Sequence, residues 1–126
     1  MEKQVRVLVA NRPKLMRELI IETLTEQPGV EIVGEVSDEN EIRERVVQTS
    51  PDLLVIALDA PGQRPRICDM VLREHPELRI IAVASDQNRS VYYWASFDIH
   101  SNDIDNSEEG FLSAVRSITT GVSPAT

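Results

Sequence analysis

The chain has 126 residues, 41% of them hydrophobic, and a formal net charge of −8. This length fits one domain that buries roughly two thirds of its unfolded surface; the hydrophobic content excludes a disordered chain, and the acidic charge argues against nucleic acid or an anionic membrane as partner. A single cysteine, Cys68, excludes an internal disulfide, and without a signal peptide or an apolar stretch of roughly 18 residues we expect a cytoplasmic protein with no membrane association.

Short apolar runs alternate along the chain with segments of helical periodicity. The β-branched run 5–10 predicts a strand, and Pro13 precedes apolar residues at three- and four-residue spacing, which predicts a helix. The run 53–58 is the most apolar and predicts a central strand covered on both faces. The full pattern predicts strands over 5–10, 30–36, 53–58, 78–84 and 98–101, and helices from Pro13, from Asp38, over 64–75, over 87–96 and from Ser107.

Five strands alternating with five helices indicate right-handed crossovers and a parallel sheet. We therefore expect an α/β fold with a doubly wound five-stranded parallel sheet in three layers, forming one domain over 1–120, with 121–126 as a tail or the start of a linker. In such a sheet, function lies beyond the carboxyl ends of the strands, at the switch in strand order. The residues expected there are Asn11, Arg12, 57–62, Ala84, Ser85 and 100–104.

Several strings resemble the receiver domains of response regulators in two-component phosphorelay signalling. They are VRVLVANRPKLMREL, VEIVGEVSDENEI, PDLLVIALDAPG, LRIIAVAS and EEGFLSAVRSI, and they span about 5–118. The resemblance implies the flavodoxin-like strand order 2-1-3-4-5. The segments VGEV and AVRSITTGVSP are similar to receivers that head DNA-binding transcription regulators. An output domain absent from this chain is therefore an alternative to a self-sufficient interaction module.

The phosphoacceptor pocket of that family is altered here at every position. The family holds Mg²⁺ with an acid pair, accepts a phosphoryl group on an aspartate, and contacts it with a Thr or Ser and a Lys. The resemblance therefore implies no catalytic residue, no enzyme activity, no Mg²⁺ binding, and a phosphorylation-independent module that binds protein partners or itself. The matching residues here are Asn11 and Arg12, Ala57, Ala84 with Ser85 displaced by one, and Asp103 or, after a slip of one residue, Ile104.

Asp59 is the only carboxylate near the end of the third strand and offers an alternative acceptor. Ala57, however, lies six residues after Pro51 and four before Pro61, as the family's aspartate does, and Asp59 would need two compensating shifts. Asp59 has two other interpretations. It pairs with Arg12 in the former metal site, or both side chains point into solvent and a pair is worth under about 1 kcal/mol.

Three of the five aromatic residues, Tyr92, Tyr93 and Trp94, lie on the predicted helix 87–96. The resemblance implies that the fourth helix, fifth strand and fifth helix meet partners or a second copy, so these aromatics form a candidate interaction face; the alternative is core packing. His100 matches the family's switch position, or it is an ordinary polar residue. The spacing of His75, His100 and Cys68 indicates no metal site.

Overall fold

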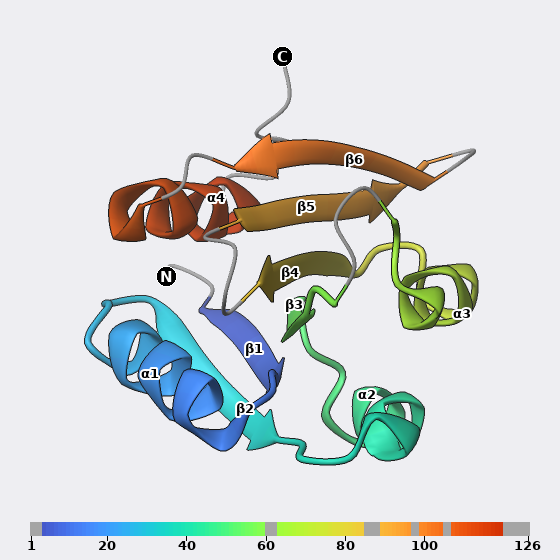
Figure 1. The fold of residues 1–126 in the computed structure, drawn as a ribbon, viewed down its shortest axis with the longest axis horizontal. Helices are drawn as coiled ribbons and strands as arrows, with labels where there is room; N and C mark the ends of the chain where they lie inside the picture. Colours follow the sequence, from blue (N-terminus) through green and yellow to red (C-terminus); the bar gives the residue numbers. More distant parts are fainter. Residues whose placement is uncertain (1–3, 60–62, 85–88, 97–98, 105–106, 120–126) are drawn as a thin grey trace.

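The computed structural model describes residues 4–59, 63–84, 89–96, 99–104 and 107–119. These residues form one six-stranded sheet in the order β2-β1-β3-β4-β5-β6, with helices on both faces (Figure 1). The strands are β1 (Val5–Ala10), β2 (Val30–Glu35), β3 (Leu53–Ala57), β4 (Arg79–Ala84), β5 (Arg89–Ala95) and β6 (Ile99–Ile104). The helices are α1 (Lys14–Thr25), α2 (Ile42–Thr49), preceded by the 3₁₀ turn Glu39–Glu41, α3 (Arg66–Glu74) and α4 (Glu108–Thr119).

The first four strands confirm the predicted parallel α/β arrangement. β1 pairs in parallel with β2 and β3, and β3 pairs in parallel with β4. β3 is covered on both faces, and its residues Leu53–Ile56 are at most 2% exposed, which explains its continuous apolar sequence. α1 ends ahead of Gly29, which has φ of 83° in the left-handed region and so allows the tight return into β2.

The predicted helix over 87–96 is wrong, because Arg89–Ala95 forms the strand β5. β5 pairs antiparallel with β4 and with β6, so the sheet has six strands and is mixed, where five parallel strands were predicted. The physical reason lies in the sequence Val91-Tyr92-Tyr93-Trp94. β-Branched and aromatic residues fit a pleated, half-buried surface better than a helix.

Alternation along β5 sends neighbouring aromatic rings to opposite faces of the sheet. Tyr92 belongs to the core cluster under α1 and α4, together with Leu24 and Val115. Tyr93 belongs to the cluster under α2 and α3, together with Leu72. Both tyrosines are buried, at 0% and 4% exposed, so they link β5 to the two helical layers.

No helix in the described part of the chain is both long enough and apolar enough to cross a membrane.

Candidate functional site

The parallel register brings the ends of β1 and β3 to one edge of the sheet. Ala10 lies opposite Ile56, so Asn11, the residue that follows β1, comes at the level of Ala57, the last residue of β3. Ala57 in turn pairs with Val83, one residue before the end of β4. The residues that follow β1, β3 and β4 therefore lie along one edge of the sheet, and the side chain that ends the central strand β3 is the methyl group of Ala57.

Arg12 and Asp59 meet at this edge, as one interpretation of the sequence predicted. The Arg12 Nη2 donates to Asp59 Oδ2 at 2.7 Å. The two side chains are 45% and 71% exposed, so water screens the pair and its contribution to folding is small. The pair nevertheless places a fixed cation within contact distance of the only carboxylate near the end of β3.

Asn11, the residue before Arg12, is fully buried, at 0% exposed. Neither its side-chain Oδ1 nor its Nδ2 has a hydrogen-bond partner within the described residues. A buried amide of this kind costs free energy, because water no longer satisfies its donor and acceptor. Packing alone would favour an apolar residue here, so stability does not explain the polar side chain of Asn11.

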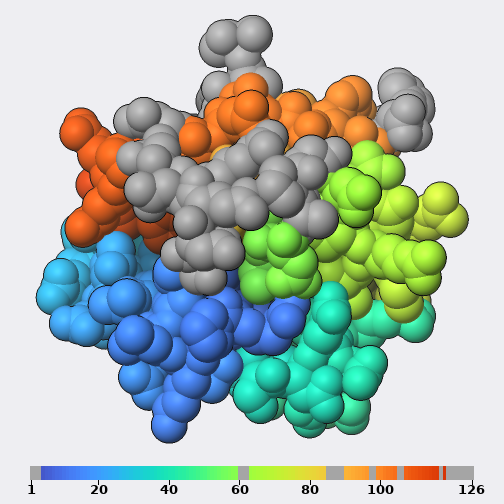
Figure 2. Space-filling view, viewed as in Figure 1, coloured from blue at the N-terminus to red at the C-terminus, as the bar shows by residue number. Residues whose placement is uncertain are grey.

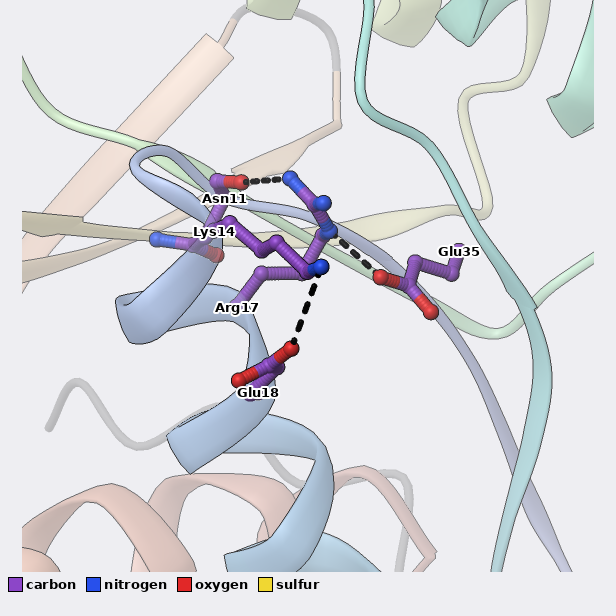
Figure 3. Close-up of polar contacts among 5 residues, drawn as sticks. All are labelled: Asn11, Lys14, Arg17, Glu18 and Glu35. Atoms are coloured by element: carbon purple, nitrogen blue, oxygen red, sulfur yellow. Dashed lines mark hydrogen bonds and ion pairs between the residues drawn. The ribbon is translucent and has the colours of Figure 1, made fainter.

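Arg17 on α1 fixes the main chain that leads into the site (Figure 3). Its Nη1 donates to the backbone oxygen of Asn11 at 3.2 Å, and its Nε donates to Glu35 Oε1 at 2.6 Å. Arg17 is only 7% exposed, whereas the Glu35 side chain is 47% exposed. This bridge was missed from the sequence. The signal that would reveal it is the β1–β2 register, which sets Val9 opposite Glu35.

The donor groups at this edge do not fit Mg²⁺. That ion prefers octahedral oxygen ligands that include one or two carboxylates. The described residues here offer the Asn11 amide oxygen and the Asp59 carboxylate, and Arg12 already holds the latter. No group of three or more His, Cys, Asp or Glu side chains suited to a metal ion occurs among the described residues.

The remaining predicted pocket residues are only partly brought together. Ala84 ends β4 and is 5% exposed, while Ser85 lies outside the described residues. Asp103 and Ile104 lie on β6, and β5 separates that strand from β4. The predicted strand order 2-1-3-4-5, in which the strand near these residues follows directly on the fourth, is therefore wrong at this point. The cause is the inserted antiparallel strand.

The predicted aromatic interaction face is also corrected. Tyr92 and Tyr93 are buried on a strand, so neither is available to a partner on a helix surface. Trp94 is partly exposed and stacks on His100, with ring centroids 5.2 Å apart and planes 19° apart. His100 is exposed on β6, and its Nε2 lies 2.6 Å from Ser96 Oγ. Its role as a switch residue stays a prediction.

Comparison with known proteins gives sequence likeness over about half of the chain. No protein-family model matches. A protein-glutamate methylesterase/protein-glutamine glutaminase 1 of Xanthomonas campestris is 31% identical over 61 residues, which are 48% of this chain and 17% of that protein. The corresponding enzyme of Hydrogenovibrio crunogenus is 34% identical over 58 residues, 46% of this chain and 15% of the enzyme. The match thus spans about a sixth of the length of these curated relatives.

Comparison with solved structures gives the class of the fold. The signal receiver domain of the putative response regulator NarL from Mycobacterium tuberculosis has a TM-score of 0.56 and 23% identity, over 68% of this chain and 69% of that one. The response regulator domain of Thermotoga maritima CheB has a TM-score of 0.55 and 24% identity, over 66% and 62%. This chain therefore has the α/β fold of response-regulator receiver domains. Its departure within that fold is the antiparallel strand β5, which makes the sheet six-stranded.

Proposed function

We propose that the chain is a degenerate receiver domain that works in two-component signalling as a phosphorylation-independent protein-interaction module. The observation that carries the proposal is Ala57 at the end of β3, beside buried Asn11 and next to the Arg12–Asp59 pair. A methyl group has no oxygen to accept a phosphoryl group. The scaffold around it, from β1 to β4, is retained.

Charge supports the same conclusion. Phosphoryl transfer on this fold needs a metal ion to neutralise the developing negative charge. The guanidinium of Arg12, 2.7 Å from Asp59, repels a divalent cation from the only carboxylate near the end of β3. A receiver normally changes state when phosphorylation adds a charged group to this edge. Without that group, one conformation dominates, and abundance or partner binding sets the output.

The rival function is a receiver phosphorylated on Asp59, whose side chain is 71% exposed. Beryllofluoride or acetyl phosphate with Mg²⁺, titrated into the ¹⁵N-labelled protein, separates the two. We expect no saturable shift of the amide signals of Asn11, Ala57 and Ala84. A saturable shift at these amides would overturn the proposal. Intact mass after acetyl phosphate treatment, with Asp59→Asn as the control, tells whether Asp59 is the acceptor.

The proposal also requires that the chain binds a protein partner. The chain is expected to bind a signalling protein or a second copy through α4 and β6, now without the helix that was predicted over 87–96, where β5 lies instead. Light scattering over a concentration series measures self-association. A chain that stays monomeric at millimolar concentration would remove the homodimer and leave a different protein as partner.

A further inference from the structure

A cavity of about 360 Å³ lies between α3 and the end of the β5–β6 pair, away from the carboxyl-edge site. Its apolar surface comes from Leu72, which is 1% exposed, and from the partly buried Ala95 and Ile99. Arg64, Asp69 and Arg73 line its polar side. A cavity of this size, lined by apolar and by charged side chains in similar number, has room for a small group or an anchoring side chain.

Two arginines of α3 keep a positive charge that no acid of the helix neutralises, although the whole chain has a net charge of −8. α3 carries Arg66 and Arg73 together with the acids Asp69 and Glu74, and these two acids pair with Arg64 and Arg43, which lie outside the helix. Figure 2 shows α3 in yellow-green along the margin of the molecule opposite α1 and α4. This surface therefore attracts negative charge that most of the chain would repel.

The arginines in and beside α3 are unequally paired. Arg64 holds Asp69 through two contacts, Nε to Oδ1 at 2.5 Å and Nη2 to Oδ2 at 3.3 Å, so the acid is neutralised within the protein. Arg66 and Arg73 form no ion pair with any residue that the structure describes. They are exposed, and so is Met70, which is 42% exposed and lies between them at i+4 from Arg66 and i−3 from Arg73. Helical spacing puts the three on one face.

We propose that the exposed face of α3 and the adjoining cavity form a docking surface for an acidic segment of a partner protein that carries an apolar anchor residue. The anchor contacts Leu72 and Ile99 inside the cavity, and carboxylates of the segment pair with Arg73 and Arg66. The inference rests on the proposed function as an interaction module, and it names the surface and the chemistry of the partner.

Physical chemistry favours a peptide of this kind over other ligands. Arginine is enriched at interface hot spots, because its planar donors hold a carboxylate in two contacts while its stem covers apolar surface. A fully polar polyanion such as nucleic acid would leave the apolar side of the cavity unfilled. A basic segment would meet Arg66 and Arg73 as like charges.

A peptide titration tests the surface. The probe is a short synthetic peptide of glutamates and leucines at helical spacing, followed by fluorescence anisotropy and by amide shifts of the ¹⁵N-labelled protein. Control peptides replace every glutamate by lysine or every leucine by serine, and a single-stranded oligonucleotide tests a polyanion. We expect saturable binding of the first peptide alone, with shifts at Leu72, Ala95 and Ile99, and weaker binding at higher salt.

Two variants with the same change of charge locate the site. Arg73→Glu should weaken binding about tenfold or more, because it turns an attraction into a like-charge contact. Lys14→Glu, on α1, should leave binding within about twofold, since exposed charges farther apart than a Debye length are largely screened. Equal effects of the two variants, shifts centred on α1, or equal binding of the lysine peptide or the oligonucleotide would overturn the inference. No phosphodonor is present, so a failure here is distinct from a failure of the phosphorylation-independent function.

Discussion

Arg12 and Asp59 are 47 residues apart in sequence and meet at 2.7 Å at the carboxyl edge of the sheet. The pair is largely exposed, and exposed pairs contribute little to folding. In a double-mutant cycle with Arg12→Ala and Asp59→Ala, we expect a coupling free energy under about 1 kcal/mol that falls as salt rises. Urea unfolding of the four proteins measures it. A salt-independent coupling well above that value would mean that the pair is shielded from solvent.

Arg17 should matter more than Arg12, since it is buried and joins two strands through two hydrogen bonds. Arg17→Met removes both contacts and leaves the backbone oxygen of Asn11 without that donor. We expect the free energy of unfolding to fall by about 1–3 kcal/mol, measured by chemical denaturation. Arg43→Met is the matched control, because its pair with Glu74 is exposed and its loss should change stability much less. Equal losses in the two variants would contradict the role given to Arg17.

Adding carboxylates tests why the carboxyl edge does not suit a metal ion. Ala57→Asp alone adds an acid beside Arg12, and we expect the guanidinium to pair with it and Mg²⁺ to stay unbound. Ala57→Asp combined with Arg12→Asp removes the cation and supplies the oxygen ligands that Mg²⁺ prefers. We expect Mg²⁺-dependent amide shifts near Asn11 in the double variant only. Mg²⁺ binding by the unaltered chain would show that Arg12 does not block the site.

Prediction from the sequence worked best where a local pattern and the fold agree. The continuous apolar runs gave β1, β3 and β4 nearly to their ends, and the parallel register then brought Arg12 to Asp59. It failed at 87–96, where alternation with helices suggested a helix although Val91-Tyr92-Tyr93-Trp94 has strand propensity. That error also moved the aromatics to an exposed face and set Asp103 beside β4. The Arg17 bridge depends on side-chain reach across two strands, which no residue spacing encodes.

The hydroxyl group of Tyr92 is buried and has no hydrogen-bond partner within the described residues. Burial raises the pKa of this phenol, and nearby Arg79 opposes the shift without a hydrogen bond of good geometry. Because an unsatisfied polar group is costly, we expect Tyr92→Phe to leave the unfolding free energy unchanged or to raise it. Tyr92→Ala should lower it by about 3–5 kcal/mol, through the cavity that it creates. A clear loss in the Phe variant would reveal a partner for the hydroxyl.

Cys68 is a thiol that the fold keeps protonated. The pKa of this thiol is raised to about 12, mainly by burial and to a smaller extent by the neighbouring carboxylate of Asp69. The folded state holds the proton at pH values where the unfolded thiol has lost it. The contribution of this thiol to the free energy of unfolding is therefore fully present below about pH 8.5 and is lost as pH rises toward 12.

Two measurements check the thiol. Iodoacetamide at pH 8 should label Cys68 only after denaturant is added. The decline of the unfolding free energy above pH 9 should be shallower in Cys68→Ala, which serves as the control, since only the titrating thiol is removed. Rapid labelling of the native protein would contradict the burial of this side chain.

The antiparallel pair β5–β6 also changes how the sheet is assembled in time. Two parallel strands can pair only after the long connection between them has folded back. β5 and β6, in contrast, are separated by only a few residues along the chain. Pairs that are close in sequence lower the contact order and lose less chain entropy when they form. The carboxyl-terminal third of the sheet can thus form from contacts that are local in sequence. Tyr92 and Tyr93 then pack against the two helical layers, one on each face of the sheet.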